Sequence, residues 1–212
     1  MKTLFVTIVG SHLWQMQTPE SDIDQMLVYQ ESTRKILEGR PIRNTKPDSA
    51  FEQGGIPVDQ KCQEIGHLVN KLIDGNMNAI LTVCSPIVVT DHPYLHELRT
   101  ITEQNLSKAS YASINGMAIS QFKDHTKRAA VLPAGKALRT TWRTCVFGQT
   151  LLLGNKIEFK PVTEDISVSD AEWIIKGLES AYTHSTLPER PDEKPFRDFL
   201  FKIRINNLPG LE

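Results

Sequence analysis

Two aspartates one residue apart, Asp22 and Asp24, carry the clearest chemical signal in the sequence. Residues i and i+2 of a β-strand project from the same face, so a strand over residues 22–29 would hold both carboxylates side by side. Like charges at that spacing repel each other, and burial adds to the penalty, unless a cation lies between them. Carboxylate oxygens are the ligands that Mg²⁺ prefers. The pair therefore predicts a divalent-cation site, while an isolated D-x-D pattern is also typical of a solvated strand end.

A third carboxylate, Asp59, lies in the short apolar stretch IPVDQK at residues 56–61 and is the best-placed partner from another strand. Two Mg²⁺ ions roughly 4 Å apart stabilise both the attacking and the leaving oxygen of an in-line phosphoryl displacement. A site of that kind would use Asp22, Asp24 and Asp59 both as metal ligands and as catalytic residues.

Gly10 and Ser11 directly follow the apolar run of residues 4–9. A Gly-Ser turn that ends a strand and opens a helix presents backbone N–H groups and a hydroxyl to an anion. Gly10 also lets the backbone approach a phosphate closely, because it has no side chain. Together with the aspartates, the turn predicts a seat for a metal–nucleotide complex.

Alternating strands and helices are predicted for the first half of the chain from its apolar periodicity and turn residues. Residues 39–55 are polar and rich in Gly and Pro, which predicts a loop or a mobile hairpin arm. We expect strands over Leu4–Val9, Asp22–Tyr29 and Ile56–Lys61, a helical turn over Ser11–Gln17, a helix over Gln63–Asp74 and an apolar segment over Met77–Val83.

The second half is predicted to be helical, because its apolar residues recur at the helical period. The expected helices span Leu95–Leu106, Ser110–Ala130, Lys136–Leu153, Ser169–His184 and Pro195–Ile205, with a small strand over Lys156–Phe159. The change of pattern predicts two domains, an αβ domain over residues 1–95 that carries the site and a helical domain over residues 96–212.

Composition narrows the class of protein. The chain has 212 residues, 40% of them hydrophobic, and a formal net charge of −1, so no global positive field indicates a long nucleic-acid partner. Its three cysteines form no C-x-x-C pair, which indicates reduced thiols. The N-terminal apolar run is far shorter than the ~20 residues of a membrane span. We therefore expect a cytoplasmic protein with no membrane partner.

The stretch GSHLWQMQTPESDID, residues 10–24, resembles the signature of the DNA polymerase β-type nucleotidyltransferases. It is most similar to the RlaP/YcgL-type predicted nucleotidyltransferases, small proteins associated with RNA repair, whose first motif reads roughly GS-x-x-x-G-x-x-x-x-x-SD-x-D. Segments 59–78 and 136–159 are similar to further parts of that family. The chain departs from the family pattern at three positions, with Gln15 for a Gly, Met77 for a Pro and Leu81 for an acidic residue.

This resemblance implies an α+β, polymerase β-like nucleotidyltransferase fold, with a small mixed sheet and flanking helices followed by a helical C-terminal half. It also implies a Mg²⁺-dependent enzyme, with Mn²⁺ as an alternative metal, that moves a nucleoside monophosphate from an NTP such as ATP to an acceptor hydroxyl and releases pyrophosphate. Several acceptors remain open: RNA, a tRNA end, a protein or a small molecule.

Residue roles follow from the same resemblance. Asp22 and Asp24 would ligate the metal, and Asp59 would be the third carboxylate, activating the acceptor hydroxyl. The nucleotide-binding residues would be Gly10, Ser11, Lys136 and Arg143. Of these, Lys136 and Arg143 would contact the phosphate or the acceptor.

Two other classes fit the same residues. A nucleotide-sugar transferase also holds a metal–diphosphate through D-x-D, but it needs a larger doubly wound sheet before the motif, which here starts at residue 10. The second is a non-catalytic nucleotide-binding or antitoxin-like interaction protein on the same scaffold. Three intact aspartates argue against that loss of activity. The sequence leaves the oligomeric state open.

Overall fold

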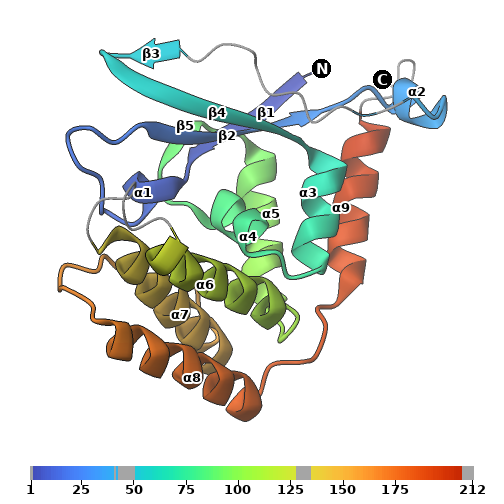
Figure 1. The fold of residues 1–212 in the computed structure, drawn as a ribbon. Helices are drawn as coiled ribbons and strands as arrows, with labels where there is room; N and C mark the ends of the chain where they lie inside the picture. The colour runs from blue at the N-terminus through green and yellow to red at the C-terminus, as the bar shows by residue number, and fades with distance from the viewer. Residues whose placement is uncertain (1, 41, 43–50, 128–134, 207–212) are drawn as a thin grey trace. The chain divides into compact units, whose positions relative to one another are not determined.

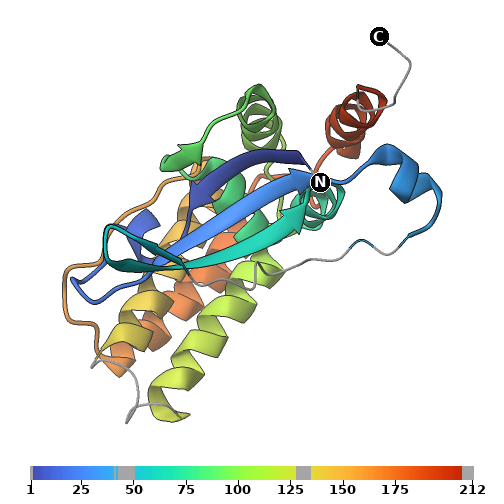
Figure 2. The same ribbon diagram turned by 90° about the horizontal axis from the view of Figure 1, so that it is seen from above.

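A mixed sheet forms the centre of the first of two units in the computed structural model, which describes residues 2–40, 42, 51–127 and 135–206. The first unit comprises Met1–Ile73, Asn78–Asn105 and Asp192–Glu212, and the second comprises Asp74–Met77 and Leu106–Pro191. The described strands have the order β3-β4-β2-β1-β5 (Figure 2). Their bounds are Lys2–Ile8 for β1, Ile23–Gln30 for β2, Phe51–Gln53 for β3, Ile56–Glu64 for β4 and Val88–Thr90 for β5.

Strand directions decide which residues meet. Strand β1 pairs antiparallel with β2 and with β5, β3 pairs antiparallel with β4, and β2 runs parallel to β4. Strand β1, which has a neighbour on each edge, carries the continuous buried run Leu4–Thr7. The parallel β2–β4 pair brings together strands that are far apart in the sequence.

Several helices cover the sheet in the first unit, and Figure 1 shows α3, α4, α5 and α9 on one side of it. The amphipathic helices α3 and α9 bury their apolar faces, for example Leu68 and Val69 on α3 and Phe196 and Phe199 on α9. The bounds are Gly10–Leu13 for α1, Thr33–Leu37 for α2, Ile65–Ile73 for α3, Met77–Cys84 for α4, Pro93–Gln104 for α5 and Glu193–Ile205 for α9.

Helices α6 (Ser110–Lys127), α7 (Lys136–Gly154) and α8 (Val168–His184) form the second unit (Figure 1). They pack on one another around a core that includes Ile114, Phe147 and Leu178. Helix α8 starts at a capping box, in which the Ser167 and Asp170 side chains each bind the backbone of the other.

This architecture confirms the predicted fold class, an α+β protein with a small mixed sheet and flanking helices. Differences concern short elements: Lys156–Phe159 forms no strand, whereas α2 and β5 are present without having been predicted. Most of the loop or hairpin arm predicted over 39–55 falls outside the described residues, and its described end forms a hairpin, in which β3 pairs with β4 across Gly54-Gly55. The last positions of the helix predicted over 110–130 also fall outside the described residues.

A predicted domain division at residues 95 and 96 stays a prediction. In the structure, α5 and α9 belong with the sheet rather than with α6, α7 and α8. Among the described residues, no helix combines the length and the apolar character that a membrane crossing requires.

Candidate active site

Parallel pairing of β2 with β4 places Asp24 directly opposite Asp59. Neighbouring strands lie about 4.8 Å apart, so the register brings two of the three predicted aspartates together. Strand β2 begins at Ile23, and Asp22 therefore lies in the preceding loop, where its side chain is exposed. Asp24 is half-buried and Asp59 is exposed. The three carboxylates therefore lie near the point where the pairing of β2 with β4 begins.

Gly10 is pressed against Asp24. Its φ of +64° lies in the left-handed region, and a Cβ built on it would meet Oδ2 of Asp24 at 1.8 Å. The neighbouring backbone is tied to the same residue, since the N–H of Val9 donates to the carbonyl oxygen of Asp24 over 2.9 Å. Only glycine satisfies both the backbone angle and the space. The Gly-Ser turn therefore lies directly against Asp24, and a shared role of the turn and the carboxylates stays a prediction.

Charge at this site is incompletely balanced. The pKa of the Asp24 carboxyl is raised above its ordinary value, chiefly by burial and next by the negative charge of Asp22, with Asp59 acting in the same direction. Lys61 and His12 oppose the rise. Lys61 lies two residues after Asp59 on β4, and its Nζ is 3.3 Å from Oδ2 of Asp59. A lysine on the chain thus supplies part of the missing positive charge.

The donor chemistry fits a hard divalent cation. All three carboxylates supply oxygen ligands, and their mutual repulsion, which raises the pKa of Asp24, would be relieved by a cation between them. As the side chains stand, no three His, Cys, Asp or Glu residues of the described chain are grouped tightly enough to hold a metal. Asp59 is turned to Lys61 instead, so metal binding would require it to leave that ion pair.

His12 also belongs to this site, on α1, the short helix that packs on β2. Its Nε2 atom is buried and has no hydrogen-bond partner within the described residues. Its effect on the pKa of Asp24 shows that the ring lies within electrostatic reach of that carboxyl.

Sequence reasoning did not select His12 or Lys61. For Lys61 a signal was available, because residues i and i+2 of a strand share a face, which aligns it with Asp59. For His12 no spacing rule applies, since its burial depends on how α1 packs.

Lys136 and Arg143, the remaining predicted nucleotide-binding residues, lie on α7 in the second unit. Lys136 is the exposed first residue of that helix, and Arg143 is half-buried. Arg139, between them, approaches Asp165 at 3.5 Å. Contact of Lys136 and Arg143 with substrate stays a prediction.

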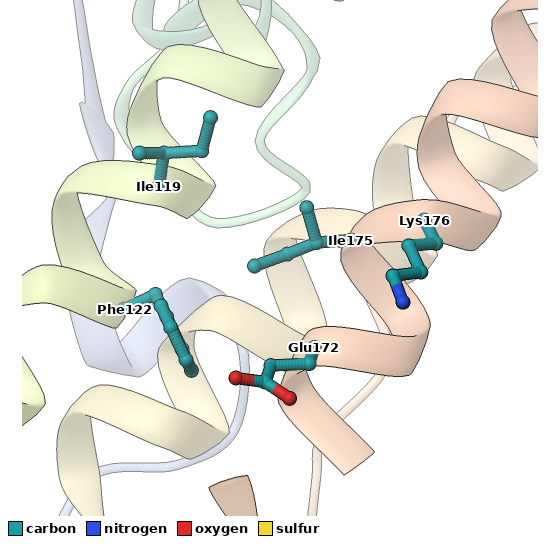
Figure 3. A pocket seen from close by; sticks show the side chains of 5 residues that line it. All are labelled: Ile119, Phe122, Glu172, Ile175 and Lys176. Carbon is teal, nitrogen blue, oxygen red and sulfur yellow. The ribbon is translucent and has the colours of Figure 1, made fainter. Parts of the chain in front are cut away.

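A separate hollow of about 440 Å³ lies between α6 and α8 in the second unit (Figure 3). Apolar side chains of Ile119, Phe122 and Ile175 line it, with Glu172 and Lys176 at its edge. None of the predicted site residues contributes to it, and its apolar lining does not suit a metal–triphosphate.

Comparisons with known proteins identify the family of the chain and test no individual site residue. No curated protein matches the chain. A solved structure, the nucleotidyltransferase-like protein from Exiguobacterium sibiricum 255-15, is 13% identical and has a TM-score of 0.36, covering 97% of this chain and 74% of that chain. That likeness is too low to assign roles to residues. A family model, RlaP, described as the RNA repair pathway DNA polymerase beta family, matches residues 1–172. The chain therefore belongs to the RlaP family of polymerase β-type nucleotidyltransferases.

Proposed function

We propose that this protein transfers a nucleoside monophosphate from an NTP to an acceptor hydroxyl, with an RNA end as the acceptor. The observation that carries the proposal is the parallel register of Asp24 with Asp59, beside Asp22 and against Gly10. That arrangement combines a carboxylate cluster with a glycine turn on adjacent strands. The RNA acceptor is supported by the family description, which names an RNA repair pathway.

The chain's own residues have distinct tasks in this reaction. Asp22, Asp24 and Asp59 would hold Mg²⁺ or Mn²⁺, which when bound neutralises charge on the phosphates. Gly10 and Ser11 present the turn against which the triphosphate lies. The acceptor oxygen attacks the α-phosphorus, and the bond to pyrophosphate breaks. Asp59, the exposed member of the pair, accepts the proton that the hydroxyl loses.

A labelled-NTP assay tests the proposal. Each of the four NTPs is offered with Mg²⁺ or Mn²⁺ and with total RNA, protein or small-molecule acceptors, using the parent chain, Asp22→Asn and Asp24→Asn. Both variants should lose metal-dependent transfer by about 100-fold or more, a loss comparable with removal of one charge-stabilising group elsewhere in catalysis.

Asp198→Asn is the matched control. Asp198 is an exposed aspartate of the same unit that pairs with Lys194 on α9 and is not one of the three candidate ligands. Its variant should retain full transfer. Equal incorporation by Asp24→Asn and the parent would refute the assignment, and incorporation into protein alone would remove RNA as the acceptor.

The sequence also left open a non-catalytic role on this scaffold. The uncompensated charge at Asp24 argues for a ligand-binding site, because a purely structural surface gains nothing from like charges held together. Calorimetric titration with Mg²⁺ and NTP separates the two, since a non-catalytic interaction protein that has lost the site would bind neither.

A further inference from the structure

His12 has a polar atom that the fold leaves without a partner. Its Nε2 is buried and makes no hydrogen bond to any described residue. Other buried polar groups nearby are bonded, for example Thr7, whose hydroxyl donates to the carbonyl of Thr82 over 2.9 Å. A buried ring nitrogen without a partner, whether it donates or accepts, destabilises the fold, because it gives up its hydrogen bond to water. Such an atom at a candidate site calls for a ligand.

Packing of α1 does not explain why this residue is a histidine. The next two residues, Leu13 and Trp14, already anchor the segment, with exposed fractions of 2% and 3%. An apolar ring at position 12 would fill the same space without an unbonded nitrogen. The histidine therefore supplies something other than packing.

The position of His12 identifies the missing partner. It follows Gly10, whose backbone lies against Asp24, by two residues, and its ring is close enough to act on the Asp24 carboxylate. A cation held by carboxylates is completed in nucleotide-dependent enzymes by phosphate oxygens. Those oxygens are strong acceptors, and hydrogen bonds to them are charge-assisted. A phosphate oxygen held beside Asp24 would be an acceptor for Nε2 of His12 if this nitrogen carries the proton.

We propose that Nε2–H of His12 donates a hydrogen bond to a non-bridging oxygen of the bound triphosphate, an inference that rests on the proposed function. His12 is then a substrate-binding residue that selects for the triphosphate over shorter phosphates. It adds a side-chain contact to a turn that otherwise offers backbone groups and the hydroxyl of Ser11.

Binding of Mg²⁺-tripolyphosphate, measured by calorimetry, tests the contact without regard to the base. His12→Phe keeps a ring but removes the donor, and its affinity should fall about tenfold, which corresponds to about 1.4 kcal/mol. His12→Gln keeps an N–H and should stay within about threefold of the parent, which corresponds to about 0.65 kcal/mol. Binding of AMP, which lacks the outer phosphates, should change in neither variant.

Thermal unfolding supplies a second measurement. If His12 had a structural role, its replacement would lower the melting temperature of the free protein, whereas the proposal predicts no loss. Without ligand, His12→Phe should be at least as stable as the parent, because no buried donor remains unbonded. Addition of Mg²⁺-tripolyphosphate should then raise its melting temperature less than that of the parent. His12→Leu repeats the comparison should the larger ring disturb α1.

The outcomes separate the two proposals. If the parent binds Mg²⁺-tripolyphosphate and His12→Phe and His12→Leu bind it equally well, the role of His12 is wrong while the proposed function stands. Loss of stability without ligand in both variants, with unchanged affinity in folded protein, would also overturn it and assign His12 a structural role. If the parent itself shows no binding, or Asp24→Asn binds as the parent does, the proposed function fails.

Discussion

Acidic side chains lie at both ends of the paired strands β2 and β4. The two ends differ in how completely the negative charges are compensated. At the far end, Glu64 is fully buried and accepts from Nη2 of Arg204 over 2.7 Å and from the N–H of Gly66 over 2.6 Å. Beside it, Glu31 pairs with Lys35 at 2.6 Å. At the starting end, Asp59 pairs with the partly exposed Lys61, and the pKa of Asp24 is raised.

This contrast distinguishes acids that the chain itself compensates from acids that it leaves only partly compensated. A buried carboxylate with a fixed cation and backbone donors is compensated within the chain. Neighbouring carboxylates without enough counter-charges repel one another. They stabilise the fold only when a cation binds between them. The following changes test that difference, beginning with the largest expected effect.

Removal of Arg204 should destabilise the fold most. Arg204→Met leaves the fully buried Glu64 without its cation, and the free energy of unfolding should fall by about 3 kcal/mol. Urea denaturation measures the loss. Arg197→Met on the same helix is the control, because Arg197 and Glu193 are about half exposed, with side-chain fractions of 50% and 49%, and the second hydrogen bond of Arg197, to Asn70, is also exposed. It should change stability by less than about 0.5 kcal/mol. Equal losses would contradict the distinction.

Gly10→Ala tests the close contact at the starting end. The added methyl must share space with Oδ2 of Asp24, 1.8 Å away, at a φ of +64°. Gly39→Ala is matched in backbone angle, with a φ of +67°, but has no atom within 4 Å of its Cβ. We expect a loss of about 1 kcal/mol for Gly39→Ala and about 2 kcal/mol or more for Gly10→Ala. Similar values for both would show that Asp24 yields easily.

Asp24→Asn should stabilise the fold, whereas Arg204→Met should destabilise it. Because the pKa of Asp24 is higher in the folded chain than its ordinary value of 3.8, the ionised carboxyl destabilises the fold at neutral pH, and this penalty disappears as the pH falls below 3.8. In chelator at pH 7, the variant should therefore melt above the parent.

The same measurement in Mg²⁺ sharpens the comparison. The parent should gain stability as the cation concentration rises, because binding to the folded state alone stabilises it. Asp24→Asn should gain much less, while Asp198→Asn should respond as the parent does. A parent that does not respond to Mg²⁺ would place the aspartates among ordinary surface acids.

Gln15→Gly should give the smallest effect. Gln15 is exposed and has a φ of +54°, in the region that favours glycine, where the family motif has a Gly. Relief of that strain should stabilise the fold by about 0.5 kcal/mol, partly offset by the greater entropy of the unfolded glycine chain. Thermal melts decide the sign. A destabilised variant would mean that the glutamine side chain stabilises the turn.

Local patterns predicted the long elements well. Helix α7 was expected over 136–153 and spans Lys136–Gly154, and α8 was expected over 169–184 and spans Val168–His184. Their apolar spacing and caps depend on neighbouring residues alone. The three-residue strand β5 could not be predicted in this way, because it forms only through pairing with β1, more than 80 residues earlier in the chain. Strand β3 is local by contrast, since it pairs with β4 across the Gly54-Gly55 turn.

The strand expected over 156–159 shows the converse. Lys156 and Lys160 pair with Glu158 across a segment that has no strand neighbour among the described residues. β-branched or aromatic content alone does not make a strand without a partner.

The site was predictable where it is local and not where it depends on register. The Gly-Ser spacing before Asp22 and Asp24 is readable in the sequence, and the family model confirms the membership that it suggested. That Asp59 lies opposite Asp24 depends on the alignment of β2 with β4. The compensation of Glu64 by Arg204, 140 residues away, has no local signal.

The discontinuity of the first unit has a consequence for biosynthesis. Its last segment, Asp192–Glu212, follows the whole of the second unit along the chain. During translation, at about 5–20 residues per second, Glu64 leaves the ribosome long before Arg204 exists to neutralise it. The nascent sheet must therefore wait, incompletely covered, while α6, α7 and α8 are made. The first unit is completed only when α9 emerges and packs on it.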